Sequence, residues 1–90
     1  MRVIVAYDIE NDKRRARAHD ILLGYMWPVQ KSLFEGELSQ PLYDGLLAEL
    51  RPLRAGGDRI RLYRLCRGCA QRVIDVGAKL EAPWESTYVA

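Results

Sequence analysis

Asp8 is the residue of this chain that is best placed to do chemistry. It ends an apolar run over residues 3–7, which is typical of a strand buried on both faces. An unpaired carboxylate in such a place would be costly to bury. One carboxylate is a poor metal site, but two copies of Asp8 brought together by a two-fold axis would hold Mg²⁺ and leave waters for chemistry. The structural alternative is that Asp8 caps the next turn or pairs with an arginine.

His19 and the two cysteines give weaker signals. His19 lies beside Ala18 and Leu22 in a helical pattern, with no second ligand at metal or triad spacing, so we expect a structural role. Cys66 and Cys69 form one CxxC motif, whereas structural zinc needs four ligands. A redox motif should open a helix after a strand, but this pair lies between two expected strands. We therefore interpret it as a tight turn with reduced thiols.

Positive charge gathers in two segments. The chain carries a net charge of +2, yet residues 51–72 hold seven arginines against one acid, Asp58, and residues 13–17 form a second basic cluster. Arginine outnumbers lysine, which suits bidentate contact with phosphate. The alternative is a solvated face balanced by acids elsewhere, but the clustering favours nucleic acid as a partner. The candidate contacts are Arg14, Arg15, Arg17, Arg59, Arg61 and Arg64.

Length and composition limit the class of protein. Ninety residues, of which 49% are hydrophobic and 29% charged, form one globular domain over residues 1–90. So short a chain buries roughly 60% of its unfolded surface, so self-association is expected. The apolar run at residues 3–7 is far shorter than the roughly 20 residues of a membrane span, and no signal peptide is apparent. We expect a soluble, reduced, cytoplasmic protein, without the motifs of P-loop, dinucleotide-binding, serine hydrolase or zinc protease sites.

The expected elements alternate between strands and helices. Strand alternation places Val3, Val5 and Tyr7 on one face and Ile4, Ala6 and Asp8 on the other. The first elements expected are a strand over 3–7 and a helix from Asn11 or Asp12 to Gly24, with Pro28 closing that segment. A strand over 29–35 follows, and then a helix that Ser39 caps, with Pro41 in its first turn and Gly56-Gly57 at its end. The last expected elements are strands over 59–65, 71–76 and 86–89. Two helices cover only one face of such an α+β sheet, so we expect a C2 dimer to cover the other.

Three segments resemble the CRISPR-associated protein two family, the small partner of the CRISPR integrase. They are residues 5–15, residues 29–36 and residues 58–66, and they occur in the family's order and spacing over nearly the whole chain. The resemblance implies a ferredoxin-like βαββαβ sandwich with an extra C-terminal strand and a homodimer with an aspartate pair in its cleft. Residues 81–90 would then be a strand that pairs with the second copy or with a partner.

The resemblance also implies a role in CRISPR adaptation. Some family members have Mg²⁺-dependent phosphodiesterase activity on RNA or DNA, whereas others bridge two integrase dimers on spacer DNA. By position, Asp8 matches the metal-binding aspartate, Tyr7 and Phe34 match aromatic residues near the cleft, and Arg15 and Arg17 match arginines that open the first helix. Pro28 stands where the family often has an arginine, which removes one expected phosphate contact.

Several functions remain open from the sequence. The first is a metal-dependent endonuclease with Asp8, Tyr7, Arg15, Arg17 and Phe34 as candidate catalytic residues. The second is a non-catalytic adaptor that binds integrase and spacer DNA, and a toxin-like ribonuclease of similar fold is a related alternative. A generic RNA-binding module would need an aromatic pair on adjacent strands, and the spacing of the aromatics fits no standard pattern.

Overall fold

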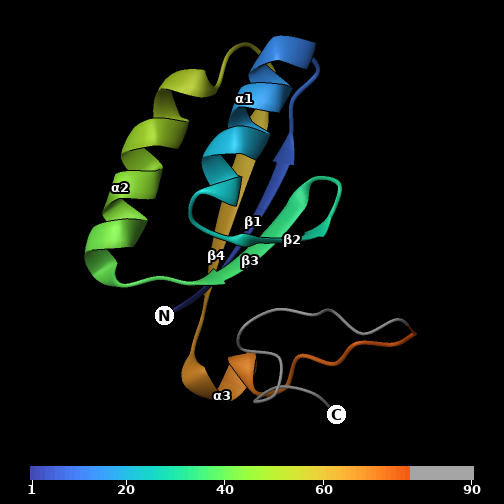
Figure 1. Cartoon of the computed structure of the whole chain (residues 1–90), viewed down its shortest axis with the longest axis vertical. Helices are drawn as coiled ribbons and strands as arrows, with labels where there is room; N and C mark the ends of the chain where they lie inside the picture. Colours follow the sequence, from blue (N-terminus) through green and yellow to red (C-terminus); the bar gives the residue numbers. More distant parts are fainter. Residues whose placement is uncertain (78–90) are drawn as a thin grey trace.

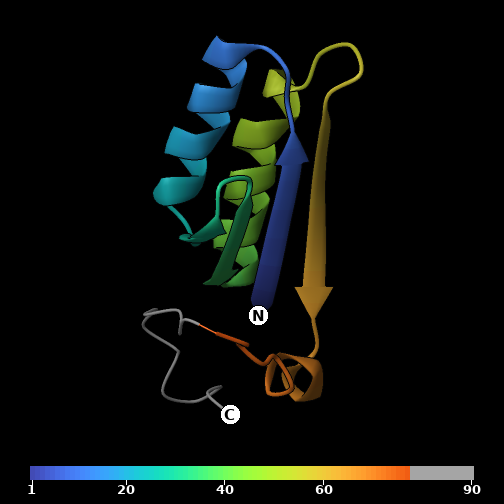
Figure 2. The same ribbon diagram turned by 90° about the vertical axis from the view of Figure 1, so that its right-hand side faces the viewer.

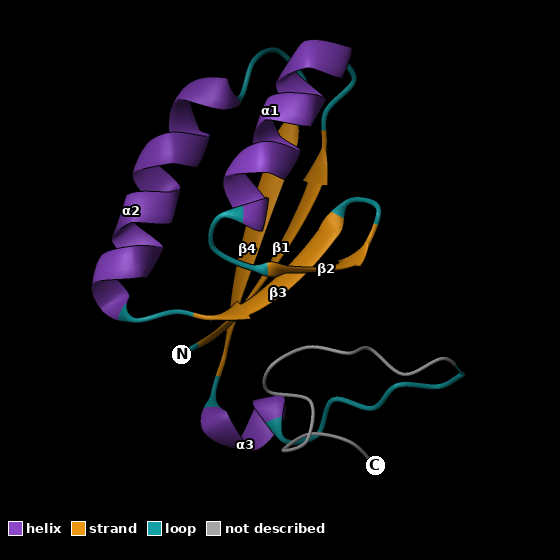
Figure 3. Cartoon of the chain, in the orientation of Figure 1, coloured by secondary structure: helices purple, strands orange, loops and turns teal. Residues whose placement is uncertain are grey.

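The computed structural model describes residues 1–77 as a four-stranded antiparallel sheet with two helices on one face (Figures 1 and 3). The sheet has the order β2-β3-β1-β4. The elements are β1 (Arg2–Asp8), α1 (Asp12–Leu23), β2 (Trp27–Gln30), β3 (Leu33–Glu37), α2 (Gln40–Leu50), the 3-10 helix η1 (Arg51–Leu53), β4 (Arg59–Leu65) and α3 (Arg67–Ala70). The α+β, ferredoxin-like fold expected from the sequence is confirmed, while the expected strand over 86–89 and the pairing role of 81–90 lie outside the described residues.

Both long helices begin where their capping residues predict. The Asn11 side chain accepts a hydrogen bond from the Arg14 amide at 2.9 Å, and the Ser39 hydroxyl accepts one from the Leu42 amide at 3.4 Å. These contacts satisfy backbone donors that a helix start leaves without partners. Helix α2 ends at Leu50, earlier than expected, and the chain tightens into η1 at Pro52 because proline lacks the amide that would continue the α-helix. No helix within residues 1–77 is long and apolar enough to cross a membrane.

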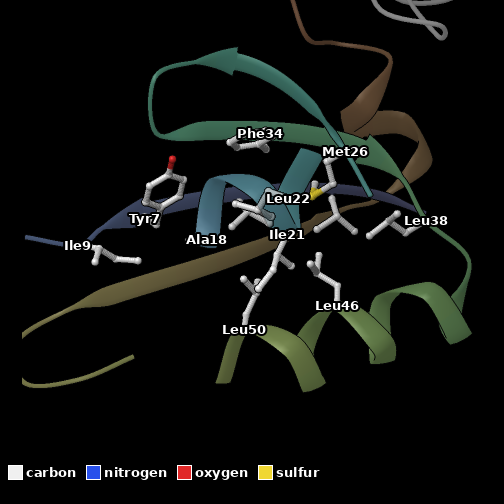
Figure 4. Packing of buried hydrophobic residues seen from close by; sticks show 12 residues of the cluster. Tyr7, Ile9, Ala18, Ile21, Leu22, Met26, Phe34, Leu38, Leu46 and Leu50 are labelled. Carbon is white, nitrogen blue, oxygen red and sulfur yellow. The ribbon is translucent and has the colours of Figure 1, made fainter. Parts of the chain in front are cut away.

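The hydrophobic core lies between the sheet and the two long helices. Val3, Val5 and Tyr7 of β1 point toward the helices, as strand alternation predicts, and all three are buried. Figure 4 shows side chains from the sheet and from both helices meeting in this layer. The core includes Ala18, Ile21 and Leu22 of α1, Phe34 of β3, and Leu46 and Leu50 of α2. The core therefore fixes which face of β1 remains for other contacts.

The opposite face of the sheet carries neither α1 nor α2 (Figure 2). We call it the open face. From the strand pairing it holds Ile4, Ala6 and Asp8 of β1, Leu33 and Glu35 of β3, Trp27 of β2, and Arg59, Arg61, Tyr63 and Leu65 of β4. Arg2 lies at one end of this face, where it is buried and bonds Glu35 at 2.7 Å and Glu37 at 2.9 Å. Asp8 lies at the other end of β1.

Two of the expected strands are wrong. Residues 29–35 do not form one strand, because the chain turns at Lys31-Ser32 and makes the hairpin β2–β3. Pro28 lies inside β2, an edge strand, where a missing amide breaks no ladder bond. Residues 71–76 are not a strand either: β4 is followed by α3, and residues 71–72 form a turn. The side chain of Cys66 accepts a hydrogen bond from the Cys69 amide, and such local bonds favour helix starts over strands.

Candidate functional site at the end of strand β1

Asp8 is exposed at the last position of β1 and pairs in register with Arg59 of β4. It lines a hollow of about 410 Å³ together with Arg15, Lys31 and Ser32, among others. Within residues 1–77, no three His, Cys, Asp or Glu side chains lie together in a group that could hold a metal ion. In the part of the chain that the structure describes, Asp8 and Glu10 are the two acidic residues that line this hollow, so one chain does not supply a three-ligand metal site there.

Arg15 holds the segment that follows Asp8. Its guanidinium donates hydrogen bonds to the carbonyl oxygens of Ile9 at 3.2 Å and Glu10 at 3.1 Å, and it pairs with the carboxylate of Asp12. These contacts tie the start of α1 to the end of β1. Because the side chain is 41% exposed, it also presents positive charge to the hollow beside Asp8. Arg15 therefore has a structural role at this site, and its contact with phosphate stays a prediction.

Tyr7 fixes the hairpin turn against the end of β1. Its hydroxyl donates to the Lys31 carbonyl at 3.2 Å, and its amide donates to the Ser32 carbonyl at 3.1 Å. Burial raises the pKa of the Tyr7 phenol, and the nearby Arg15 charge offsets this only in part. The phenol is therefore protonated at neutral pH, so it does not serve as a general base. Its role at the site is to position Lys31 and Ser32.

Phe34 belongs to the core, and the half-buried His19 packs against it. Phe34 is fully buried and stacks on the Tyr7 ring, with the centroids 6.3 Å apart. The His19 ring meets the edge of Phe34 at 5.3 Å. A fully buried ring does not reach a substrate on the open face, so the structure corrects the expectation that Phe34 acts there. His19 has the structural environment that its sequence context suggested.

Asp58 is a structural residue near the site that the sequence did not single out. It is buried, and its carboxylate accepts a hydrogen bond from Arg14 at 3.1 Å, while its carbonyl accepts one from Arg54 at 3.1 Å. Burial raises the pKa of this carboxyl, but the hydrogen bond and charge of Arg14, with backbone hydrogen bonds from Ala55 and Glu10, lower it below its ordinary value. The available signal was that Asp58 is the one acid within the run of arginines. It joins the start of α1 to the start of β4.

The Asp58 contact gives a pH-dependent stability that can be measured. Because the pKa of Asp58 is lower in the folded chain than in the unfolded one, its stabilisation is present above the unfolded value and is lost as the pH falls through the folded value. Asp58→Asn is expected to lower the melting temperature by about 5 °C at neutral pH. Thermal unfolding followed by circular dichroism should show the two proteins converging below about pH 4. An equal difference at every pH would contradict this account.

The arginines of residues 51–72 do not form one surface, contrary to the expectation of a common basic grip. Strand alternation places Arg59 and Arg61 on the open face, where the Arg61 guanidinium lies 5.1 Å from the Tyr63 ring. Arg64 points to the helix side and lies 5.6 Å from the Tyr43 ring of α2. Of the arginines in residues 51–72, Arg59 and Arg61 therefore share a face with Asp8. Arg14 is engaged by Asp58, and Arg17 is exposed on α1.

These features define a class of small ferredoxin-like proteins that carry an acid at the end of the first strand. Residues 1–73 match the family model of CRISPR associated protein Cas2. This chain belongs to the Cas2 family. The identification confirms the resemblance that the three sequence segments indicated.

Known relatives agree in sequence and in fold. CRISPR-associated endoribonuclease Cas2 4 of Rhodospirillum rubrum is 38% identical over 89 residues, which cover 98% of this chain and 72% of that protein. The crystal structure of Streptococcus pyogenes Cas2 matches with a TM-score of 0.72 and 26% identity, over 86% of this chain and 100% of that chain. A chain of a partial Cas6-RT-Cas1–Cas2 complex matches with a TM-score of 0.65 over 83% of this chain and 89% of that chain. At 24% identity, this last likeness shows the shared fold alone.

Proposed function

We propose that this chain is a homodimeric endoribonuclease that cleaves RNA phosphodiester bonds with Mg²⁺ held between two Asp8 carboxylates. The observation that carries the proposal is the position of Asp8. It is an exposed acid that ends a strand whose other residues are buried or half-buried, and it lies beside a hollow with cationic walls. The name of the Rhodospirillum rubrum relative, an endoribonuclease, supports RNA as the substrate.

The open face supports the homodimer. It exposes two large aromatic side chains, Tyr63 at 42% and Trp27 at 38%, next to the half-buried Ile4, Leu33 and Leu65. Apolar surface of this kind gains free energy when a partner covers it. A second copy of the same face is a self-complementary partner, and the resulting interface has two-fold symmetry. A two-fold axis near the end of β1 would bring the two Asp8 residues together.

Within residues 1–77, one chain supplies too few ligands for a magnesium ion at the end of β1, so the ion would be held only where two chains bring their carboxylates together. Carboxylate oxygens are ligands that Mg²⁺ prefers, and it keeps several waters when few protein ligands are present. When bound, the ion would neutralise charge on the phosphate and supply an activated water at neutral pH. Arg15 and Lys31 line the hollow and attract the phosphate, while Arg59 and Arg61 add positive charge on the same face as Asp8.

A non-catalytic role in CRISPR adaptation is the second candidate. The protonated Tyr7 provides no general base, and the fold is shared with a chain from a Cas1–Cas2 assembly. In that case the dimer would bind spacer DNA through its arginines and would dock with Cas1. Nucleic acid would then be bound through its backbone and released as salt rises.

One experiment tests the proposal and separates the two candidates. The purified full chain is incubated with labelled RNA and with labelled DNA, in Mg²⁺, in Mn²⁺ and in EDTA. The proposal expects metal-dependent cleavage of RNA that stops in EDTA. Salt-sensitive binding of nucleic acid without cleavage would contradict the nuclease and favour the adaptor.

A further inference from the structure

Cys66 and Cys69 share the first turn of helix α3, at the end of β4. Cys66 caps this helix with an extended backbone, and its Sγ accepts a hydrogen bond from the Cys69 amide at 3.3 Å. Both cysteines are exposed, and neither is in a disulfide. The structure therefore corrects the expectation of a turn between two strands. The pair brackets a single helical turn that directly follows a strand, and a CxxC motif is a setting in which the pKa of a cysteine is lowered.

The surroundings give the two thiols different reactivities. The hydrogen bond from the Cys69 thiol, followed by backbone hydrogen bonds from Cys69 and Gly68, lowers the pKa of Cys66. The same thiol contact and the charge of Cys66 raise the pKa of Cys69. The thiolate is the nucleophile in thiol–disulfide exchange. Cys66 is therefore suited to attack first, and Cys69 is suited to resolve the intermediate.

The space beside Cys66 is large enough for a small disulfide. Cys66 and Arg67 line a hollow of about 480 Å³ together with Glu37 and Arg2, which pair with each other, among others. Arg67 is exposed and provides positive charge next to the reactive sulfur. Oxidised glutathione is small and carries carboxylates that suit a guanidinium. Within residues 1–77, the two thiols belong to no group of three ligands that could hold a metal ion, which favours redox chemistry over zinc binding.

We propose that Cys66 and Cys69 form a redox-active dithiol that reacts with low-molecular-weight disulfides such as oxidised glutathione. The Cys66 thiolate attacks one sulfur of the disulfide, its S–S bond breaks, and one glutathione leaves with the electron pair and takes up a proton. The Cys69 thiolate then attacks Cys66 Sγ and releases the second glutathione in the same way. Two protein thiols are oxidised to one disulfide, and one glutathione disulfide is reduced to two thiols.

This site is independent of the proposed nuclease. Cys66 follows Leu65, which pairs with Arg2 at the start of β1, whereas Asp8 pairs with Arg59 at the other end of the strands. The proposed disulfide would therefore form beyond one end of β1, and Asp8 lies at the other end. Failure of RNA cleavage would not affect this proposal, and failure of disulfide formation would not affect the nuclease.

The test uses the reduced full chain in EDTA with oxidised glutathione. Mass spectrometry is expected to show wild type losing two hydrogens per chain without retaining glutathione. Cys69→Ser should keep one glutathione on Cys66, because no second thiol remains to resolve the mixed disulfide. Cys66→Ser should react about tenfold more slowly, because Cys69 lacks the backbone hydrogen bonds that lower the pKa of Cys66. Circular dichroism checks that both serine variants are folded. Wild type that retains glutathione on both cysteines, or that links chains together, would overturn the proposal, as would equal rates for the two variants.

Discussion

Replacing Asp8 with asparagine is expected to lower Mg²⁺-dependent RNA cleavage by about 100-fold or more, because removing a group that stabilises transition-state charge typically costs this much. The change keeps the size of the side chain and removes the charge that would hold the ion. Asp8 is exposed and contributes nothing to the core, so the fold and the dimer should persist. Initial cleavage rates on labelled RNA, at saturating Mg²⁺, measure the effect.

Asp20→Asn is the matched control for this prediction. Asp20 is also an exposed aspartate, and it lies on α1, away from the end of β1. The control loses the same charge and should keep wild-type cleavage. If Asp8→Asn cleaves RNA as fast as Asp20→Asn, Asp8 does not act in the reaction, and the activity comes from another site or from a contaminant.

Replacing Tyr63 with glutamate is expected to weaken the dimer by about 100-fold or more, since truncating or charging a central aromatic residue of an interface commonly costs over 2 kcal/mol. Tyr63 is 42% exposed on the open face and packs against Arg61. In a symmetric interface each substitution occurs twice, so two new carboxylates would be desolvated together. Sedimentation velocity over a range of concentrations reports the shift from dimer to monomer.

Leu42→Glu provides the corresponding control. Leu42 is 49% exposed, which is close to the exposure of Tyr63, but it lies on α2 on the helix side of the molecule. The Leu42→Glu variant therefore carries the same new charge away from the open face, and it should remain dimeric. Circular dichroism verifies that both variants are folded. A dimer that survives Tyr63→Glu, or one that is weakened equally by Leu42→Glu, would place the interface elsewhere.

Much of the fold follows from local signals in the sequence. The alternation of Val3, Val5 and Tyr7 predicted the buried face of β1, and the caps at Asn11 and Ser39 predicted the two helix starts. Alternation and helix capping depend only on residues that are close together in the chain, so both can be read from a single sequence. The position of Asp8 at the end of β1 was predictable for the same reason, whereas its exposure was not, because the sequence favoured a strand buried on both faces.

Contacts between distant residues were not predictable in this way. Pairing between β2 and β3 decided that residues 29–35 are a hairpin, and Pro28 is tolerated because β2 is an edge strand. The bond from Arg14 to Asp58 spans 44 positions, and the isolation of Asp58 among arginines does not indicate which arginine it pairs with. The sequence suggested a strand at 71–76, but α3 ends at Ala70 and residues 71–72 form a turn.

The division of the arginines also depends on tertiary structure. The sequence shows seven arginines over residues 51–72, which favours one basic surface. In the fold, alternation along β4 sends Arg61 and Arg64 to opposite faces, and each contacts a tyrosine. Charge clustered along a strand is therefore shared between two faces.

Mixed dimers give the most direct test of the paired Asp8 site. Wild type and Asp8→Asn are combined in equal amounts, and their subunits are allowed to exchange to equilibrium before RNA cleavage is measured at fixed total protein. If one ion needs both carboxylates, only dimers with two wild-type chains are active, and the rate is expected to be about one quarter of the wild-type rate. A rate of about one half would show that each chain acts alone, and it would contradict a site shared across the two-fold axis.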